Sequence, residues 1–159
     1  AGEGALSDAV RAMPAFRIRL LRESDLPEVL VIETAAFSTP WRENTFRGLM
    51  RRADTDLFVA DAVGRVVGYA ACWTVVDQSE LGNVAVDEAA RGRGIGGALV
   101  DAVVRRVRER GALELFLEVR ESNVGAQSVY LERGFAVIGR RRSYYSSPTE
   151  DALIMRLRV

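Results

Sequence analysis

The sequence predicts a single domain of mixed α/β class, with a mostly antiparallel sheet, a central parallel pair of strands and about four flanking helices. Three observations support this prediction. The chain has 159 residues, which fits one hydrophobic core better than two. Its composition, 48% hydrophobic and 28% charged, is that of a globular protein. Stretches that alternate apolar and polar residues are interspersed with stretches of helical spacing.

The first third of the chain predicts one strand and two helices. The first 15 residues are rich in Ala and Gly and are expected to form a flexible leader, so the domain is assigned to residues 16–159. Alternation beginning at Phe16 predicts a strand. Ser24-Asp25-Leu26-Pro27 predicts a helix start, with a capping side chain and Pro in the first turn. Residues 41–52 predict a second, short helix.

The middle of the chain predicts an antiparallel hairpin. Residues 57–60 and 66–76 pair across a turn at residues 61–64. The second strand is the longest apolar stretch and is far too short to span a membrane. It contains Cys72, the one Cys of the chain, so no internal disulfide can form and a buried, inert thiol in a reducing compartment is expected.

The second half predicts a strand, helix, strand crossover with two parallel strands. A strand over residues 81–86 is followed by a turn rich in Arg and Gly. A helix of about residues 95–110 comes next and ends at Gly111, and residues 113–119 form the second parallel strand. The remaining elements are a short helix and two closing strands, at residues 125–133, 136–145 and 152–158.

Missing residue types exclude several kinds of chemistry. The chain has no His, which excludes His general bases, His-containing triads and His metal ligands. It has no Lys, which excludes Schiff-base chemistry and the P-loop. The 22 basic and 22 acidic residues balance, without the basic excess typical of nucleic-acid binding. Arg140-Arg141-Arg142 beside two Tyr is therefore interpreted as a solvated strand face rather than an RNA site.

The turn at residues 91–97 indicates an anion site. It lies between a strand and the first turn of a helix, where backbone N–H groups and the helix dipole favour negative charge. Glycines allow the backbone to approach phosphate oxygens, and two Arg side chains add positive charge. Four Gly in six residues cost chain entropy without an expected gain in packing, so a pyrophosphate site is favoured over a plain connection.

A dinucleotide is the competing ligand for this turn. Gly92, Gly94 and Gly97 satisfy the G-x-G-x-x-G fingerprint, and Glu118 ends the next strand where a ribose-binding acid is expected. The fingerprint, however, comes after half of the chain, so too few strands remain for a Rossmann sheet. The sequence favours a different pyrophosphate ligand.

A second group of candidate residues follows the turn. Glu118 lies near the carboxyl end of a strand, which in an open α/β sheet points towards the ligand crevice. Tyr130, on the next helix, can face the same crevice, and Asn123 at the helix start suits both capping and holding a ligand amide. Singly, each also has an ordinary structural interpretation: a salt bridge from Glu118 to Arg120, a helix filler and a cap.

Together, the turn and these residues resemble the GNAT superfamily of acetyl-CoA-dependent N-acetyltransferases. Arg91, Gly94 and Gly96 match the superfamily pattern [Q/R]-x-x-G-x-[G/A], and the resemblance runs from Phe16 to the C-terminus. Archaeal and eukaryotic N-terminal acetyltransferases share the turn and much of the paired-Tyr segment. The segments that resemble the bacterial ribosomal-protein-alanine N-acetyltransferases (RimI type) are Phe37-Ser38-Thr39-Pro40-Trp41, Asn83-Val84-Ala85-Val86-Asp87, Leu117-Glu118-Val119-Arg120 with Ser122-Asn123, and Tyr144-Tyr145 with Pro148, Glu150-Asp151-Ala152 and Met155.

The resemblance implies a role for each candidate. Glu118 matches the family's general base and Tyr130 its general acid. Trp41, Tyr144 and Tyr145 would line the acceptor groove, which Gly82, where relatives often carry a larger apolar residue, could widen. Acetyl-CoA would be a co-substrate, without a metal, held by Val84, Ala85, Val86, Arg91, Gly92, Arg93, Gly94, Ile95, Gly96, Gly97 and Asn123.

The implied reaction is direct acetyl transfer, in a ternary complex, to the N-terminal α-amine of a protein, with Ala or Ser of a small-subunit ribosomal protein as acceptor. An α-amine with a pKa near 8 must lose a proton before it attacks, which a carboxylate can accept, and a Tyr can protonate the leaving thiolate. The alternatives are acetylation of Lys side chains or small-molecule amines, and a non-catalytic coenzyme A sensor. A cytoplasmic monomer or weak dimer, without nucleic-acid or membrane partners, is expected.

Overall fold

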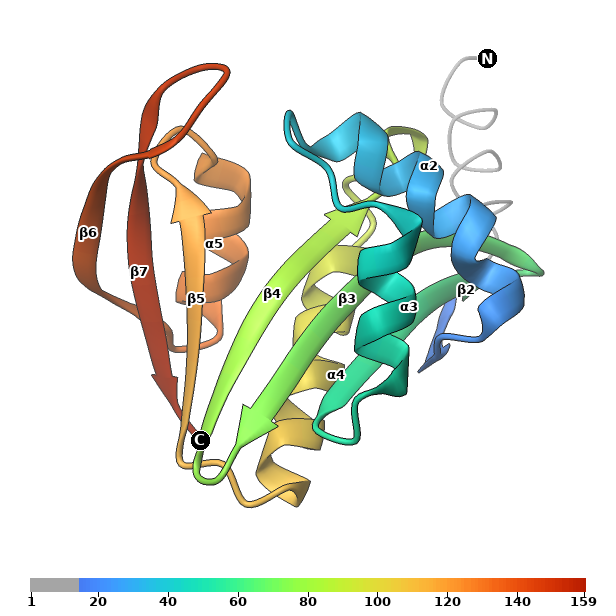
Figure 1. Ribbon diagram of the computed structural model, residues 1–159, viewed down its shortest axis with the longest axis horizontal. Helices are drawn as coiled ribbons and strands as arrows, with labels where there is room; N and C mark the ends of the chain where they lie inside the picture. The colour runs from blue at the N-terminus through green and yellow to red at the C-terminus, as the bar shows by residue number, and fades with distance from the viewer. Residues whose placement is uncertain (1–14) are drawn as a thin grey trace, which may run out of the picture.

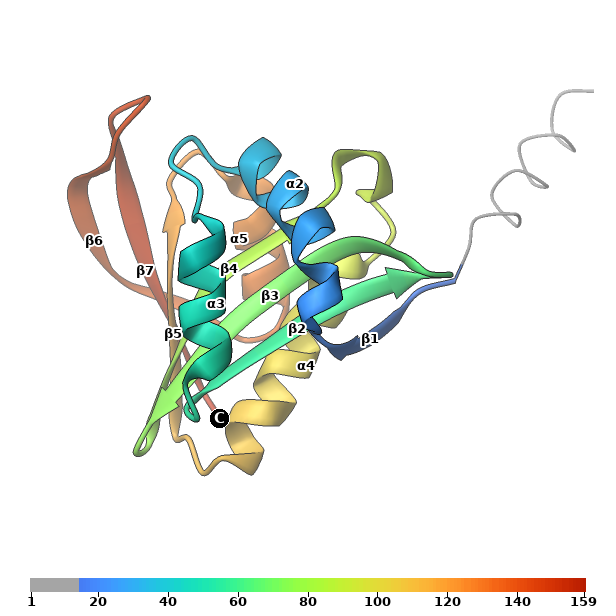
Figure 2. The ribbon, with the colours of Figure 1, turned by 45° about the vertical axis from the view of Figure 1, so that its right-hand side comes forward.

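The computed structural model describes residues 15–159, so nearly all of the expected leader lies outside the described residues. Within them, seven strands form one sheet in the order β1-β2-β3-β4-β5-β7-β6. Helices α2 and α3 cover one face of this sheet, and α4 and α5 cover the other (Figures 1 and 2). No helix of the described chain is both long and apolar enough to cross a membrane. The fold is the mixed α/β arrangement that the sequence predicts.

The first elements begin where the sequence predicts, but the expected helix cap is wrong. These are β1 (Arg17–Leu20), the 3-10 turn η1 (Glu23–Asp25), α2 (Leu26–Ala36) and α3 (Glu43–Arg51). The Asp25 side chain does not cap α2. Its carboxylate instead accepts two hydrogen bonds of 2.8 Å from Arg19, which hold the pKa of Asp25 below its ordinary value. Arg19 on β1 therefore binds this carboxylate in place of the N–H groups at the start of α2.

The predicted hairpin is present, with a longer first strand and a tighter turn than expected. Strand β2 (Thr55–Ala62) pairs with β3 (Arg65–Val75), and β3 with β4 (Gln78–Val86), all antiparallel. The first turn consists of Val63 and Gly64 only, both with positive φ, as in two-residue hairpin turns.

The predicted crossover is also confirmed. Strand β4 leads through η2 (Glu88–Ala90) and α4 (Ile95–Glu109) to β5 (Glu114–Arg120), which lies parallel to it. This is the one parallel pair of the described sheet, so the dinucleotide-binding Rossmann alternative is wrong. The chain is completed by α5 (Val124–Glu132), β6 (Ala136–Tyr145) and β7 (Glu150–Arg158).

Two cores lie on opposite faces of the sheet. The larger one packs α4 and α5 against the sheet, and Leu99, Val103 and Val107 of α4 are fully buried there. The smaller one lies under α2 and α3. Cys72 is buried in the larger core, where burial raises the pKa of its thiol to about 12. The expected burial of Cys72 is therefore confirmed, and a buried thiol of high pKa is a poor nucleophile.

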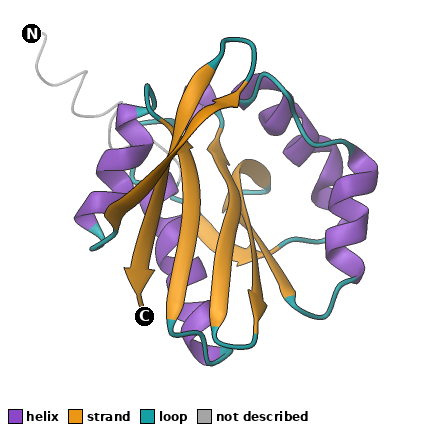
Figure 3. Cartoon of the chain, turned by 60° about the vertical axis from the view of Figure 1, so that its left-hand side comes forward, coloured by secondary structure: helices purple, strands orange, loops and turns teal. Residues whose placement is uncertain are grey.

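Strands β4 and β5 diverge at their carboxyl ends. Their pairing covers only residues 78–81 of β4 and 114–117 of β5, although β4 continues to Val86 and β5 to Arg120. Figure 1 shows the opening between the two strands, and Figure 3 shows the β6–β7 hairpin crossing beside it. Beyond Leu81, β4 remains paired with β3 on one edge, but no described strand pairs with the edge that faces β5. The backbone N–H and C=O groups on that edge therefore make no hydrogen bonds to β5.

Candidate active site

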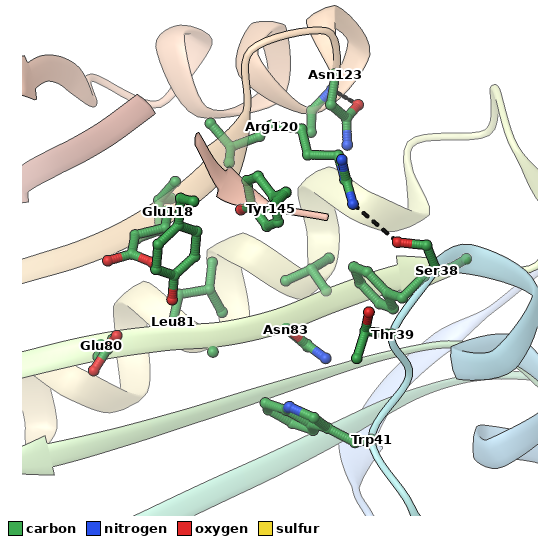
Figure 4. Close-up of a pocket in the computed structure, with 18 of the residues that line it drawn as sticks. Ser38, Thr39, Trp41, Glu80, Leu81, Asn83, Glu118, Arg120, Asn123 and Tyr145 are labelled. Atoms are coloured by element: carbon green, nitrogen blue, oxygen red, sulfur yellow. Dashed lines mark hydrogen bonds between the residues drawn. The ribbon is translucent and has the colours of Figure 1, made fainter. Parts of the chain in front are cut away.

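A cavity of about 570 Å³ lies at this opening between β4 and β5. Its walls come from six parts of the chain, namely β3, β4, β5, α5 with its N-cap, the end of β6 and the segment between α2 and α3 (Figure 4). The structure brings to this cavity seven of the predicted catalytic, cofactor-binding and acceptor-binding residues: Trp41, Val84, Glu118, Asn123, Tyr130, Tyr144 and Tyr145. They lie as far as 104 positions apart, Trp41 to Tyr145, so the fold is what assembles them.

Other predicted residues lie outside the cavity wall. Ala85, Val86 and the turn at residues 91–97 are absent from its lining. The turn follows the carboxyl end of β4, at the start of α4. The expected cofactor residues therefore form two groups, one in the cavity and one beyond the end of β4.

Glu118 is held in the cavity by two residues of β6. Its Oε1 lies 2.9 Å from Nε of Arg141, and its side chain is 21% exposed. A hydrogen bond to Glu118 is the main cause that raises the pKa of the Tyr144 hydroxyl. The ordinary interpretation, a salt bridge from Glu118 to Arg120, is wrong, because Arg120 pairs with Glu150. Residues two positions apart on a strand point to the same face, so the two side chains are neighbours, but Arg141 pairs with Glu118 in place of Arg120.

Tyr130 reaches the cavity from α5. It is 8% exposed, and its ring packs against Phe135 with centroids 5.6 Å apart. Burial, with a smaller contribution from Tyr145, raises the pKa of Tyr130 to about 12. The hydroxyl therefore keeps its proton at neutral pH, as a proton donor must.

Asn123 caps α5, so its ordinary interpretation is confirmed. Its Oδ1 accepts a hydrogen bond of 3.2 Å from the backbone N–H of Ala126. The amide nitrogen takes no part in this contact, although the residue also lines the cavity. Capping and ligand binding can thus use different atoms of the same side chain.

The two adjacent Tyr residues reach the same cavity because β6 is irregular. The register between β6 and β7 shifts between Arg141 and Tyr145, and Ser143 has a positive φ of 50°. A bulge of this kind bends a strand and redirects its side chains. The rings of Tyr144 and Tyr145 meet edge to face, with centroids 5.1 Å apart.

The glycine turn has the geometry of an anion site. Gly92 and Gly94 both have a φ of +79°, and space is open where a side chain would stand. Gly94 is the N-cap of α4 and provides no side-chain acceptor for the first N–H groups of the helix. Arg91 and Arg93 are exposed, and their recorded hydrogen bonds within residues 15–159 go to backbone carbonyl groups, at 3.4 Å. These features fit a pyrophosphate group.

Gly97 corrects one part of the sequence argument. A Cβ atom at this position would lie 2.8 Å from Cζ of Arg133, whose Nε donates to the Gly97 carbonyl at 3.2 Å and to Asp101 at 2.8 Å. The missing side chain therefore allows α5 to pack against α4. At this position, contrary to expectation, glycine does help packing.

Gly82 does not widen the groove. A Cβ atom here would overlap the Trp73 ring, 2.6 Å from its Cζ3 and closer still to its Cη2, and would lie 3.0 Å from Cη2 of Trp41. The indole of Trp73 fills this space, and its Nε1 donates to Glu80 at 3.1 Å. The small residue at position 82 is therefore balanced by a large one on the neighbouring strand β3.

Two side chains that contact the candidate site residues were missed by the sequence analysis. Glu33, 0% exposed, accepts hydrogen bonds from the Trp41 backbone N–H at 2.8 Å and from Asn83 Nδ2 at 2.9 Å. Burial raises the pKa of Glu33 to about 7. Glu33 lies among the apolar positions of its helix, and a carboxylate in that pattern was the sequence signal that could have identified it. Arg141 is exposed, as expected for a solvated face, but its contact with Glu118 was not predicted.

Comparison with known proteins gives consistent results. The model of the acetyltransferase (GNAT) family matches residues 19–135. A ribosomal protein bS18-alanine N-acetyltransferase of Salmonella typhimurium is 36% identical over 144 residues, which cover 89% of this chain and 97% of that protein. The crystal structure of the ribosomal-protein-S18-alanine N-acetyltransferase from Escherichia coli is similar, with a TM-score of 0.83 and 34% identity over 91% of this chain and 94% of that one. Ard1 from Thermoplasma volcanium has a TM-score of 0.84 at 28% identity, over 91% of this chain and 98% of that one.

Proposed function

Because the chain belongs to the acetyltransferase (GNAT) family, we propose that it transfers the acetyl group of acetyl-CoA to the N-terminal α-amine of a ribosomal protein that begins with Ala or Ser. One observation carries the proposal. Glu118 and Tyr130 line the same cavity as Trp41, Tyr144 and Tyr145, so a base, an acid and an aromatic acceptor wall surround one space. The chain also spans nearly the whole length of bacterial relatives that act on ribosomal protein bS18.

Two groups of residues would bind different parts of the cofactor. The N–H groups at the start of α4 and the positive-φ glycines of the turn would hold the pyrophosphate, with Arg91 and Arg93 adding charge. The edge of β4 beyond Leu81, free of β5, would face the pantetheine arm, and Asn123 Nδ2 would meet it from α5. Acetyl-CoA supplies an activated thioester when bound.

The protein residues then perform two proton transfers. Glu118 accepts a proton from the α-ammonium group, directly or through a water, which leaves the nitrogen lone pair free to attack the thioester carbonyl carbon. A C–N bond forms, the C–S bond breaks, and Tyr130 donates its proton to the departing sulfur. The nitrogen loses a second proton as the amide forms, and solvent carries that proton to the Tyr130 oxygen. The proton held by Glu118 returns to solvent, so one proton is released in each turnover. No covalent intermediate on the protein is required, which suits a chain without His, Lys or an activated Cys.

The proposed acceptor also indicates the compartment in which the reaction takes place. A ribosomal protein is made and assembled in the cytoplasm, so we assign the activity to that compartment. A groove that recognises the backbone and a small first side chain rejects a bulky one by steric overlap, whereas a missing methylene lowers affinity by only about 1 to 3 kcal/mol. Ala and Ser should therefore be used at similar rates.

The test is incubation of the purified protein with acetyl-CoA and a panel of peptides that differ only in the first residue, followed by mass spectrometry. We expect one acetyl group on the α-amine, added fastest to peptides that begin with Ala or Ser. The absence of transfer to every α-amine in the panel would overturn the proposal.

A further inference from the structure

The guanidinium of Arg120 lies between two loops on opposite sides of the cavity. One is the segment between α2 and α3, residues 37–42, and the other is the segment between β6 and β7, residues 146–149. Nη2 of Arg120 donates to the Ser38 hydroxyl at 2.9 Å, as Figure 4 shows, and to the Ser146 carbonyl oxygen at 3.2 Å. One nitrogen atom therefore contacts both loops.

Arg120 is fixed most firmly on the β6–β7 side. Nη1 donates to the Pro148 carbonyl oxygen at 3.1 Å and to Glu150 Oε2 at 3.2 Å. The guanidinium also lies over the Tyr145 ring, 4.3 Å from its centroid. These contacts use the planar, forked donors that distinguish Arg from Lys. They leave Nη2 aimed at the opposite loop.

Ser38 completes the connection. Its hydroxyl accepts from Arg120 and in turn donates to the Ser146 carbonyl oxygen at 3.4 Å. Ser38, Arg120 and Ser146 all line the cavity, together with Trp41 and Tyr145 of the proposed acceptor wall. The two loops that carry this wall are thus joined by a three-residue bridge, which is named the Ser38–Arg120–Ser146 bridge below.

We propose that Arg120 is a positioning residue, which fixes the spacing of the two loops and thereby the width of the passage through which the acceptor reaches Glu118. This inference rests on the proposed function. Arg120 touches neither Glu118 nor Tyr130 by any hydrogen bond or ion pair recorded for the described residues, so its effect is on the acceptor wall rather than on proton transfer.

The bridge should therefore act on acceptor binding and leave cofactor binding alone. Losing one charge-assisted hydrogen bond changes an equilibrium constant by roughly tenfold. We expect Arg120→Ala to raise the peptide KM by about that factor or more, with a smaller effect on kcat and an unchanged Kd for acetyl-CoA. Arg120→Lys should not restore the KM, because a single ammonium cannot contact both loops and Glu150 at once.

Ser38→Ala supplies the second half of the test. It should raise the peptide KM by itself, and it should add little in a chain that already carries Arg120→Ala, because both changes break the same bridge. Arg156→Ala is the matched control. Arg156 lies on β7 and pairs with Glu114 of β5 at 3.6 Å, away from the lining of the cavity, so its loss should leave the peptide KM unchanged.

The measurements are steady-state kinetics with an Ala-initiated peptide, acetyl-CoA titration by calorimetry and urea unfolding of each variant. A peptide KM within twofold of the parent in Arg120→Ala would overturn the inference, and so would effects of Ser38→Ala and Arg120→Ala that simply multiply. If Arg120→Ala fails to fold, an unchanged KM in Ser38→Ala overturns it. A parent chain that acetylates no peptide would refute the proposed function instead.

Discussion

The backbone N–H of Trp41 donates a hydrogen bond of 2.8 Å to Glu33, a carboxylate buried beneath the acceptor wall. The same carboxylate accepts from Asn83 Nδ2 on β4 at 2.9 Å. Both donors are neutral, so no cation compensates the buried charge, and burial raises the pKa of Glu33 to about 7. The segment that carries Trp41 is thus tied to the sheet by a group that titrates near neutral pH.

This pair makes stability depend on pH. The pKa of Glu33 is higher in the folded chain, about 7, than its ordinary value of 4.5, so the folded chain binds the proton more tightly. The contribution of protonated Glu33 to the free energy of unfolding is fully present below about pH 4.5 and is lost as pH rises through about 7. The difference corresponds to at most about 3 kcal/mol. Glu33→Gln, which cannot ionise, should gain stability relative to the parent between pH 5 and pH 8 in urea unfolding. A stability difference that stays constant over this range would contradict the account.

Replacing either proposed proton-transfer residue should slow the chemical step. Glu118→Gln removes the proton acceptor, and Tyr130→Phe removes the proton donor. Each variant keeps the shape of the side chain, so kcat should fall about 10²- to 10⁴-fold because of the lost proton transfer. The Kd for acetyl-CoA should change little. Because burial raises the pKa of Tyr130 to about 12, its loss should matter equally at pH 7 and pH 9. A variant within a few-fold of the parent at both pH values would remove that residue from the mechanism.

Negative charge in the glycine turn should weaken cofactor binding. Gly94→Asp places a carboxylate at the N-cap of α4, where the pyrophosphate is proposed to bind, and calorimetry should show a large loss of acetyl-CoA affinity. Gly94→Asn is the matched control, because it has nearly the same shape, tolerates positive φ and carries no charge. Equal affinities in the two variants would show that charge at this position is irrelevant.

A side chain at position 82 should destabilise the protein. Gly82→Ala forces the Trp73 ring to move, and overpacking of this kind costs about 1 to 3 kcal/mol in urea unfolding. Gly48→Ala in α3 is the control, because nothing lies within 4 Å of its added methyl group, and alanine there should stabilise the helix slightly. An unchanged stability in Gly82→Ala would mean that Trp73 does not depend on the space at position 82.

The order of helices and strands could be predicted because it depends on local patterns. Alternation marks β1 and the hairpin, helical spacing marks α4, and Gly111, with a φ of +86°, ends α4 as expected. The divergence of β4 and β5 could not be predicted. Strand β4 continues past Leu81, with a register shift against β3 at Gly82, and β5 continues past Leu117, so only the pairing in space shows where the two strands separate.

The site could be predicted only in part, for the same reason. Glu118 and Tyr130 were found through a motif, and the fold does bring them to one cavity. The partner of Glu118 could not be found, because Arg141 reaches it from another strand. Similarly, the hydrogen bond from Asn83 to Glu33 joins residues 50 positions apart, which no local pattern records.

The most direct measurement compares two peptides of one sequence, incubated with the protein and acetyl-CoA and read by mass spectrometry. One begins with a free Ala, and the other is blocked at its N-terminus and carries an internal Lys. The account predicts faster acetylation of the free α-amine. Equal or faster acetylation of the blocked peptide would contradict it and identify the protein as a Lys side-chain acetyltransferase.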